Sequence, residues 1–360
     1  MSRPLLFSRY PALKSRIPFT PFGNYPSAVE HLDNLSRHTG SDIWIKRDDC
    51  ASSILGGNKC RMMEWVIPDA VNRGRKSLVS WGALGSNQVL ASSIFGKRAG
   101  FDDITAIYSR QPCHDYVREN FLISTTLGVV QKLGQNSVSF ALRLAGSYIW
   151  KLITGGKPYL IPLVGSSPVS VLSHFDAALE LEQQIRSGEC PRPDRIFVTV
   201  GTGGTAAGLI LGSMVLGNIG EVVGVSVIEK TYVNKRMIAW EINRAVRYLK
   251  RRGVNLGVGR VKASDINLVQ GYMGSAYAEP TSRGLKAIDL LKDLEDITLD
   301  VTYTSKTMAA MLDCIREHEN GRFLFWHTKN TIDMKEYTEH LPDISELDRC
   351  FRKYLEKREK

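Results

Sequence analysis

Short apolar runs alternate along this chain with longer amphipathic stretches. The runs have the length of strands, which we expect at residues 42–46, 77–80, 104–109, 129–132, 158–162, 195–200, 222–228 and 322–326. Helices are expected between them, for example at residues 60–72, 88–99, 170–187 and 205–216. Strands and helices in alternation favour an α/β fold with mainly parallel sheets.

The length of 360 residues favours two domains. We expect residues 61–168 to form a small domain, and residues 1–60 and 169–347 to form a large one. The turn-rich stretch at 161–168 is where the chain would cross back, and residues 348–360 resemble a basic amphipathic helical tail. Ligands of open α/β sheets bind outside the carboxyl ends of the strands, so functional residues should lie in loops that follow strands.

The composition is that of a globular protein, with 43% hydrophobic and 23% charged residues. The sequence contains no apolar run long enough to cross a membrane and no secretory signal at Met1 to Tyr10. Its six cysteines are scattered and form no CxxC pair, which favours reduced thiols over disulfides or a metal site. We therefore expect a cytoplasmic protein without a metal ion or a membrane partner.

The formal net charge of +10 raises the question of nucleic acid binding, because residues 235–252 are rich in Lys and Arg. Apolar residues recur there at helical spacing, at Ile238, Trp240, Ile242 and Val246, so we interpret the stretch as a helix with one core face and one solvated face. No nucleic acid partner is expected. A basic balance also suits an anionic cofactor and a carboxylate substrate.

Lys59 ends the segment GGNK at residues 56–59, just where a helix should begin. The helix macrodipole disfavours a cation there, whereas a neutral amine or imine fits. A lysine that forms a Schiff base must spend time neutral, and burial lowers its pKa to allow this. From the spacing alone, an exposed lysine after a glycine turn is the favoured interpretation.

The glycine-rich segment GTGGTAAG at residues 201–208 follows one expected strand and opens a helix. Glycines allow close backbone approach to an anion, and a helix N-terminus offers free N–H groups to a phosphate. The alternative is a tight turn without a ligand. The segment also fits a dinucleotide fingerprint, with Gly201, Gly203 and Ala206 in place and Glu229 after the next strand, so an NAD-type oxidoreductase competes at this point.

A third segment, GSNQ at residues 85–88, follows the expected strand at 77–80. Its short polar side chains at a helix start could hold a carboxylate or a phenolic oxygen. An ordinary N-cap is the alternative.

Taken together and in this order, the segments resemble the D-cysteine desulfhydrase and 1-aminocyclopropane-1-carboxylate (ACC) deaminase family. The matching stretches read IWIKRDDC, GGNKCRMMEW, GALGSNQ, VTVGTGGTAAGL, YMGSAYAEPT, LDVTYTSKTMAAML and FLFWHT. The family is a branch of the fold-type-II, tryptophan-synthase-β-like enzymes that use pyridoxal 5′-phosphate (PLP). The resemblance implies two domains of three-layer αβα architecture with open, twisted, mostly parallel sheets, and it displaces the dinucleotide interpretation.

The resemblance also implies roles for residues. The lysine matching Lys59 bears PLP as a Schiff base and takes the α-proton of a small amino-acid substrate. Asn87 would contact the phenolic oxygen of PLP, while Ser86 and Gln88 hold the substrate carboxylate. The cofactor-binding set is Asn58, Lys59, Asn87, Gly201, Thr202, Gly203, Gly204, Thr205, Thr304 and Thr328. Tyr277 and Tyr303 match active-site tyrosines that move a proton or orient the substrate.

One position separates the two activities of the family. ACC deaminases look to carry a glutamate near the pyridine nitrogen, where this chain has Thr304, as the desulfhydrases do. Thr328 would be the second hydroxyl at the ring. A hydroxyl holds the nitrogen's proton less well than a carboxylate, which suits β-elimination better than opening a cyclopropane.

The substrate side departs from the family pattern. Lys329 and Asn330 replace two glycines, residues 89–91 lack an arginine that is common there, and Gly85 stands where a glutamine is common. We expect D-cysteine desulfhydrase-like elimination to pyruvate, ammonia and sulfide. The alternatives are a specialised biosynthetic lyase or β-replacement enzyme, an ACC deaminase, and a PLP-binding protein without turnover. The resemblance further implies a homodimer.

Overall fold

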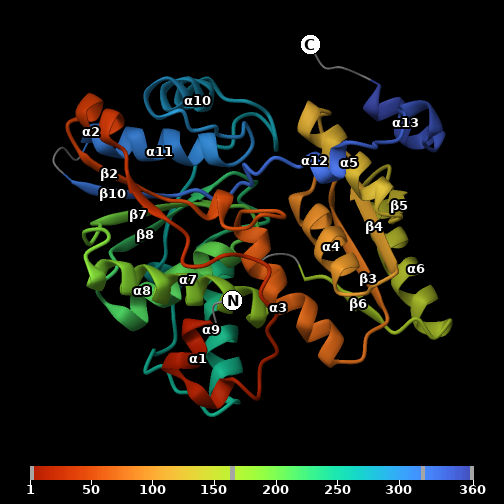
Figure 1. The fold of residues 1–360 in the computed structure, drawn as a ribbon, viewed down its shortest axis with the longest axis horizontal. Coiled ribbons are helices and arrows are strands. Elements are labelled where there is room, and N and C mark those ends of the chain that lie inside the picture. The colour runs from red at the N-terminus through yellow and green to blue at the C-terminus, as the bar shows by residue number, and fades with distance from the viewer. Residues whose placement is uncertain (1–3, 163–166, 318–320, 357–360) are drawn as a thin grey trace. The chain divides into compact units, whose positions relative to one another are not determined.

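The computed structural model describes residues 4–162, 167–317 and 321–356. The chain forms two compact units. The first unit consists of Met1–Ile17, Gly23–Met62 and Val164–Ile332, and the second of Pro18–Phe22, Met63–Leu163 and Asp333–Lys360. Each is an α/β unit with its own sheet (Figure 1).

The first unit has a six-stranded sheet in the order β1-β2-β10-β7-β8-β9. Its strands are β1 (Val29–His31), β2 (Asp42–Lys46), β7 (Arg195–Val200), β8 (Glu221–Ser226), β9 (Asn267–Val269) and β10 (Arg322–Trp326). All neighbours are parallel except β1 and β2. The chain steps in one direction from β7 to β9 and then back to β10. With the right-handed crossovers that are the rule between parallel strands, this reversal puts helices on both faces of the sheet.

The helices of this unit form the two outer layers, with α7, α8 and α9 on one face and α2, α10 and α11 on the other (Figure 1). Their bounds are α1 (Leu5–Arg9), α2 (Asp33–Thr39), α7 (Pro168–Ser187), α8 (Gly204–Leu216), α9 (Lys235–Lys250), α10 (Ser282–Glu295) and α11 (Thr304–Glu317). A buried apolar cluster that includes Phe197, Phe323 and Phe325 joins the sheet to the second of these layers. The predicted three-layer, mainly parallel fold is confirmed.

The second unit has a parallel four-stranded sheet in the order β5-β4-β3-β6. Its elements are β3 (Ser77–Ala83), α4 (Asn87–Arg98), β4 (Asp103–Ser109), α5 (Asp115–Thr126), β5 (Val130–Leu133), α6 (Ser137–Ile153), β6 (Pro158–Leu160), α12 (Lys335–Thr338) and α13 (Arg349–Leu355). The helix α3 (Asn58–Asn72) begins in the first unit and ends in the second.

The second unit includes two segments that lie outside the small domain expected from the sequence. These are Pro18–Phe22 and Asp333–Lys360. Phe22 stacks on Phe95 of α4 with 4.6 Å between ring centroids, and Phe351 of the tail helix lies 4.7 Å from Phe121 of α5. The aromatic residues of both segments are therefore part of this unit's packing. Most of the expected crossing stretch, residues 163–166, lies outside the described residues.

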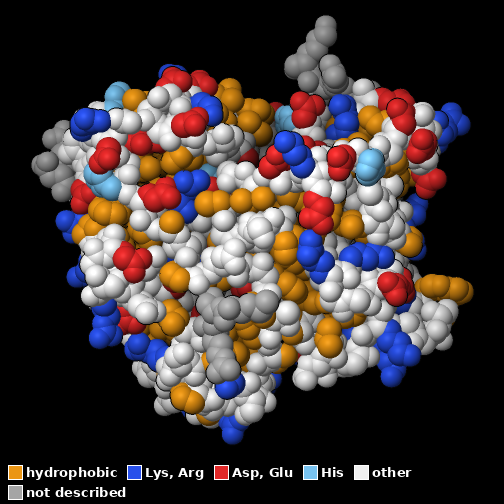
Figure 2. Space-filling view, in the orientation of Figure 1, with side chains coloured by type: hydrophobic (Ala, Val, Ile, Leu, Met, Phe, Trp, Pro, Cys, Tyr) orange, Lys and Arg blue, Asp and Glu red, His pale blue; other side chains and the backbone are white. Residues whose placement is uncertain are grey.

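The basic stretch forms α9, whose buried face carries Ile238 and Ile242 as expected. The placement of Trp240 on that face was wrong, because its side chain is half exposed and lies under the Arg244 guanidinium. Basic and acidic side chains are interspersed on the face drawn in Figure 2, without one large patch of a single sign. Among the described residues, no helix is long and apolar enough to span a membrane.

Candidate functional site

Two of the segments singled out in the sequence, GGNK and the glycine loop, follow neighbouring parallel strands at the same edge of the first sheet, together with the segment that carries Thr328. β10 lies between β2 and β7, and all three run in the same direction. The chain after β2 leads to Lys59, the glycine loop follows β7, and Thr328 follows β10. This is the carboxyl edge at which ligands of open α/β sheets bind.

Direct contacts join these three segments. The Asn58 backbone N–H donates to the Thr328 carbonyl oxygen at 3.0 Å, and the Asn58 side-chain amide donates to the Thr205 hydroxyl at 2.9 Å. Gly57 has a φ of +83°, and a Cβ there would lie 2.5 Å from the Thr328 oxygen. Only glycine permits this approach. Asn58 is thus a structural clamp between the start of α3 and the glycine loop.

Lys59 is the second residue of α3, and its side chain is partly exposed. The protein atoms around the amine desolvate it, which lowers the pKa of Lys59 to about 7. Within the described part of the chain, the amine has no hydrogen-bond or ion-pair partner. The neutral amine is therefore a substantial fraction of the Lys59 population near pH 7.

The glycine loop ends on Gly203, which has a φ of +103° and is the N-cap of α8. The first nine residues of α8 are buried, so the helix starts with its free N–H groups in a desolvated setting. The positive end of the macrodipole favours an anion there. A Cβ at position 203 would lie 3.2 Å from the Glu241 Oε2 atom, in a backbone conformation that side chains rarely adopt, so this position suits glycine.

Tyr277 and Tyr303 lie together, and their hydroxyls share a short hydrogen bond. The ring of Tyr303 lies 3.9 Å from the position a Cβ would take on Gly201, which brings the pair to the glycine loop. Two structural features near these tyrosines in the chain were not found from the sequence. Lys306 donates to the carbonyl oxygen of Met273, and Ala278, next to Tyr277, adopts the strained left-handed backbone.

Asp300 caps α11 and fixes the Thr304 hydroxyl. Its carboxylate accepts the N–H groups of residues 302, 303 and 304, and also the Thr304 hydroxyl proton at 2.7 Å. The Asp300 N–H in turn donates to the Thr304 oxygen at 2.9 Å. The hydroxyl of Thr328 has no such bond among the described residues.

Ser86, Asn87 and Gln88 lie in the second unit and are described there by themselves. Ser86 is the N-cap of α4 and accepts the N–H of Val89 at 3.3 Å, so the ordinary capping role is present. The amide of Asn120 on α5 donates to the Asn87 side-chain oxygen at 3.1 Å and orients it. Binding roles for these residues stay predictions.

A buried ionic cluster at the start of α3 was not found from the sequence. It consists of Lys46, Asp48, Arg61 and Glu180, and Ser27 completes its hydrogen bonds. Burial alone would raise the pKa of Asp48 and Glu180, but Arg61 and Lys46 lower it below the usual range. Arg61 follows Lys59 by two residues, so this cluster fixes the helix turn that carries the lysine.

Asn330, one of the two residues expected to depart from the pattern of the resemblance, has a structural function. Its side-chain oxygen accepts the Gly56 N–H at 2.7 Å, and a Cβ on Gly56 would lie 1.9 Å from the carbonyl oxygen of Asp49. The Asn330 side chain therefore stabilises the turn before Lys59.

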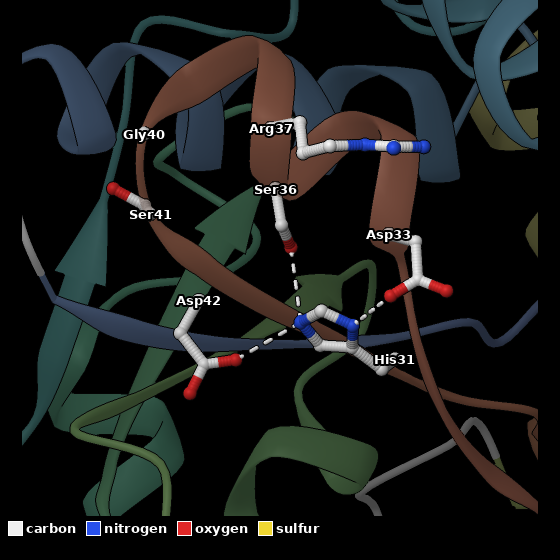
Figure 3. Close-up of a pocket in the computed structure, with 7 residues that line it drawn as sticks. All are labelled: His31, Asp33, Ser36, Arg37, Gly40, Ser41 and Asp42. Carbon is white, nitrogen blue, oxygen red and sulfur yellow. Dashed lines mark hydrogen bonds and ion pairs between the residues drawn. The ribbon is translucent and has the colours of Figure 1, made fainter.

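An open cavity of about 540 Å³ lies at the other end of β2 (Figure 3). His31 spans it, with Nδ1 2.6 Å from Asp33 and Nε2 3.2 Å from Asp42. Asp42 is the first residue of β2, so this cavity is separate from the predicted site. No group of three or more potential metal ligands occurs among the described residues, and the six cysteines are free thiols.

Comparison with known proteins agrees with this geometry. The family described as "Pyridoxal-phosphate dependent enzyme" matches residues 21–329. A putative ACC deaminase of Pyrococcus furiosus is 31% identical, with 88% of this chain and 93% of the relative covered. A D-cysteine desulfhydrase of Salmonella typhimurium is 30% identical, with 91% and 98% covered. The crystal structure of an ACC deaminase homologue has a TM-score of 0.75 at 27% identity, covering 94% of this chain and 98% of that one.

The residues present fit PLP. A neutral lysine can condense with its aldehyde, and a glycine cradle at a helix N-terminus can bind its phosphate. The family match sets aside the dinucleotide interpretation of residues 201–208. The chain belongs to the pyridoxal-phosphate dependent enzyme family, within the group of lyases and deaminases that its ACC deaminase and D-cysteine desulfhydrase relatives represent.

Proposed function

We propose that the enzyme eliminates sulfide from D-cysteine, with pyruvate and ammonia as the other products. The observation that carries this choice is the state of the Thr304 hydroxyl, whose proton is donated to Asp300. The side chain at this position can accept a hydrogen bond, but it has no proton to give and no negative charge. It cannot keep a ring nitrogen protonated as a carboxylate would. This favours expulsion of a good leaving group over the opening of a cyclopropane.

Lys59 is the residue to which we assign both cofactor attachment and removal of the substrate α-proton. PLP, when bound, supplies a ring that stabilises negative charge at the substrate α-carbon. A lysine with a pKa of about 7 accepts and releases a proton readily at neutral pH. The loop Gly201–Thr205 is proposed to bind the phosphate, with Asn58 as its clamp.

The other predicted residues take supporting roles in this proposal. The Thr328 hydroxyl donates to the ring nitrogen, since its proton is not used by the described protein groups. Asn87 binds the phenolic oxygen, and Ser86 and Gln88 bind the substrate carboxylate. The hydrogen-bonded pair of Tyr277 and Tyr303 protonates the departing sulfur, because one hydroxyl can donate while the other replaces its proton.

The rate at which the apoenzyme captures PLP is expected to rise with pH between 6 and 8. Only the neutral Lys59 amine attacks an aldehyde, and its pKa of about 7 sets the midpoint of the rise. Stopped-flow absorbance of PLP mixed with apoenzyme measures this rate. A rise centred above pH 9 would contradict a desolvated lysine.

The substrate assignment is tested by incubating the holoenzyme with D-cysteine, L-cysteine and ACC in parallel, with Lys59→Ala as the blank. We expect sulfide, pyruvate and ammonia from D-cysteine, and no ammonia from ACC. Ammonia from ACC but not from D-cysteine would contradict the proposal. A holoenzyme inert towards all three would instead favour a specialised substrate or a binding protein without turnover.

A specialised amino-acid lyase or β-replacement enzyme is the second candidate. It is favoured by Lys329 and Asn330, which stand in place of two family glycines beside Thr328. We further propose a homodimer, as in the family, and exposed apolar side chains on α6 such as Leu142 and Trp150 offer a surface for it. The cytoplasm stays the proposed compartment, and the six free thiols support it.

A further inference from the structure

Glu241 on α9 is a buried carboxyl group that the proposed chemistry does not use. Glu241 is 1% exposed, and neither of its carboxyl oxygens has a hydrogen-bond partner among the described residues. An ionised carboxylate in such a place is very costly, so the group is expected to keep its proton. Burial raises the pKa of Glu241 to about 9, with only partial opposition from Arg244.

This carboxyl lies against the glycine loop. A Cβ on Gly203 would lie 3.2 Å from the Glu241 Oε2 atom and 3.4 Å from Ile238. Glu241 and Ile238 are one turn apart on α9, so the same face of this helix supports the residue that caps α8. The unpartnered acid is therefore aimed at the N-terminus to which the cofactor phosphate is assigned.

Few other charges act on this carboxyl. α9 packs against α7, α8 and the 3₁₀ turn Ala263–Asp265. α8 has no titratable side chain, and Asp265 of the turn accepts the Lys262 N–H. The titratable residues of α7 are His174, Asp176, Glu180, Glu182 and Arg186, and those of α9 itself are Lys235, Arg236, Glu241, Arg244, Arg247, Tyr248 and Lys250. Among the described residues, Arg244 is the one whose charge acts on Glu241.

We propose that Glu241 is a proton-bearing positioning residue of the phosphate loop, so that phosphate binding at the loop and proton binding by Glu241 favour each other. A protonated carboxyl offers an O–H donor and no negative charge beside the phosphate. An ionised one would repel the phosphate across the short distance to Gly203 in a poorly screened setting. The inference rests on the proposed phosphate site and adds a pH control to it.

The test compares the wild type with Glu241→Gln, which keeps the shape of the side chain but cannot ionise. Dissociation constants of PLP for the full-length apoenzyme are measured by absorbance from pH 7 to pH 10. We expect the ratio of the wild-type to the variant constant to be about tenfold higher at pH 10 than at pH 7, because pH 10 is about one unit above the pKa. A ratio of the two dissociation constants that stays the same from pH 7 to pH 10 would overturn the inference.

Two controls separate this inference from the cofactor assignment. Pyridoxal, which lacks the phosphate, should show no difference in pH dependence between the two proteins. An equal difference with pyridoxal would overturn the coupling to phosphate. Inorganic phosphate is titrated by calorimetry on the same proteins, because its binding needs no lysine chemistry. It therefore decides the inference even if PLP fails to bind.

The pH dependence of folding stability reports independently whether Glu241 carries a proton in the folded state. The folded state keeps a proton on Glu241 up to about pH 9, whereas the unfolded state loses it near the ordinary pKa of 4.5. Between these values the folded state binds more protons, so stability falls as pH rises. The urea midpoint of the wild-type apoenzyme is expected to fall relative to Glu241→Gln between pH 5 and pH 9. A constant difference would show that Glu241 is ionised throughout.

Discussion

Replacing Lys59 with alanine is expected to reduce turnover about 10²–10⁴-fold, which is the loss of rate that follows removal of a positioned proton-transfer group. The variant should also lose the visible absorption band of bound PLP. Two features of Lys59 are the reason. Its amine has a pKa of about 7, and it lies at the start of α3, where the neighbouring Asn58 side chain is hydrogen-bonded to Thr205 of the glycine loop. Steady-state assays and absorption spectra of the purified proteins measure both effects.

The matched control for this prediction is Lys329→Ala. Lys329 directly follows Thr328 and is the other lysine that the sequence puts beside the ring. The band should persist in Lys329→Ala and vanish in Lys59→Ala. The reverse pattern would move the cofactor to Lys329 and refute the assignment made from the GGNK segment.

Glu180→Ala is expected to lower the free energy of unfolding by about 3–5 kcal/mol, the cost of breaking a buried ion pair by removing one partner. Glu180 is buried and accepts hydrogen bonds from Arg61 and Lys46, which are themselves buried. Its loss leaves two buried cations with Asp48 as the remaining carboxylate of the cluster. Urea denaturation monitored by circular dichroism measures the change.

An exposed ion pair provides the comparison for this variant. Arg316 lies 2.9 Å from Asp313, and its side chain is 76% exposed. Arg316→Ala should change the free energy of unfolding by only about 0–1 kcal/mol. Similar losses in the two variants would mean that the cluster beneath Lys59 is not the anchor inferred here.

Local patterns were sufficient for most of the fold. The bounds of β2, β7 and β10 agree with the expected strands, because buried parallel strands are continuous apolar runs between turn residues. β1 and β9 were not predicted, and β6, which is equally short, was expected two residues too long, since strands of three residues carry little periodic signal. Trp240 was misplaced because helical spacing gives the order of residues around a helix but does not show where the buried sector ends.

Candidate site residues could be predicted from the sequence only where they belong to one continuous segment with a recognisable pattern. The segments carrying Lys59 and the glycine loop have glycine patterns that reveal them. Asp300 had no such pattern although its partners lie only two to four residues away, and Asn120 and Glu241 had none because their roles arise from contacts with another element. For Glu241 a signal existed, since it is the one acid among the basic residues 235–252 and follows an apolar spacing.

The most direct test of the central claim is to locate the cofactor on the chain. The holoenzyme is reduced with borohydride, which fixes PLP on its lysine, and is then digested and mapped by mass spectrometry. A pyridoxyl-phosphate adduct is expected on the peptide that contains Lys59. An adduct on another lysine, or no adduct in protein incubated with PLP, would contradict it.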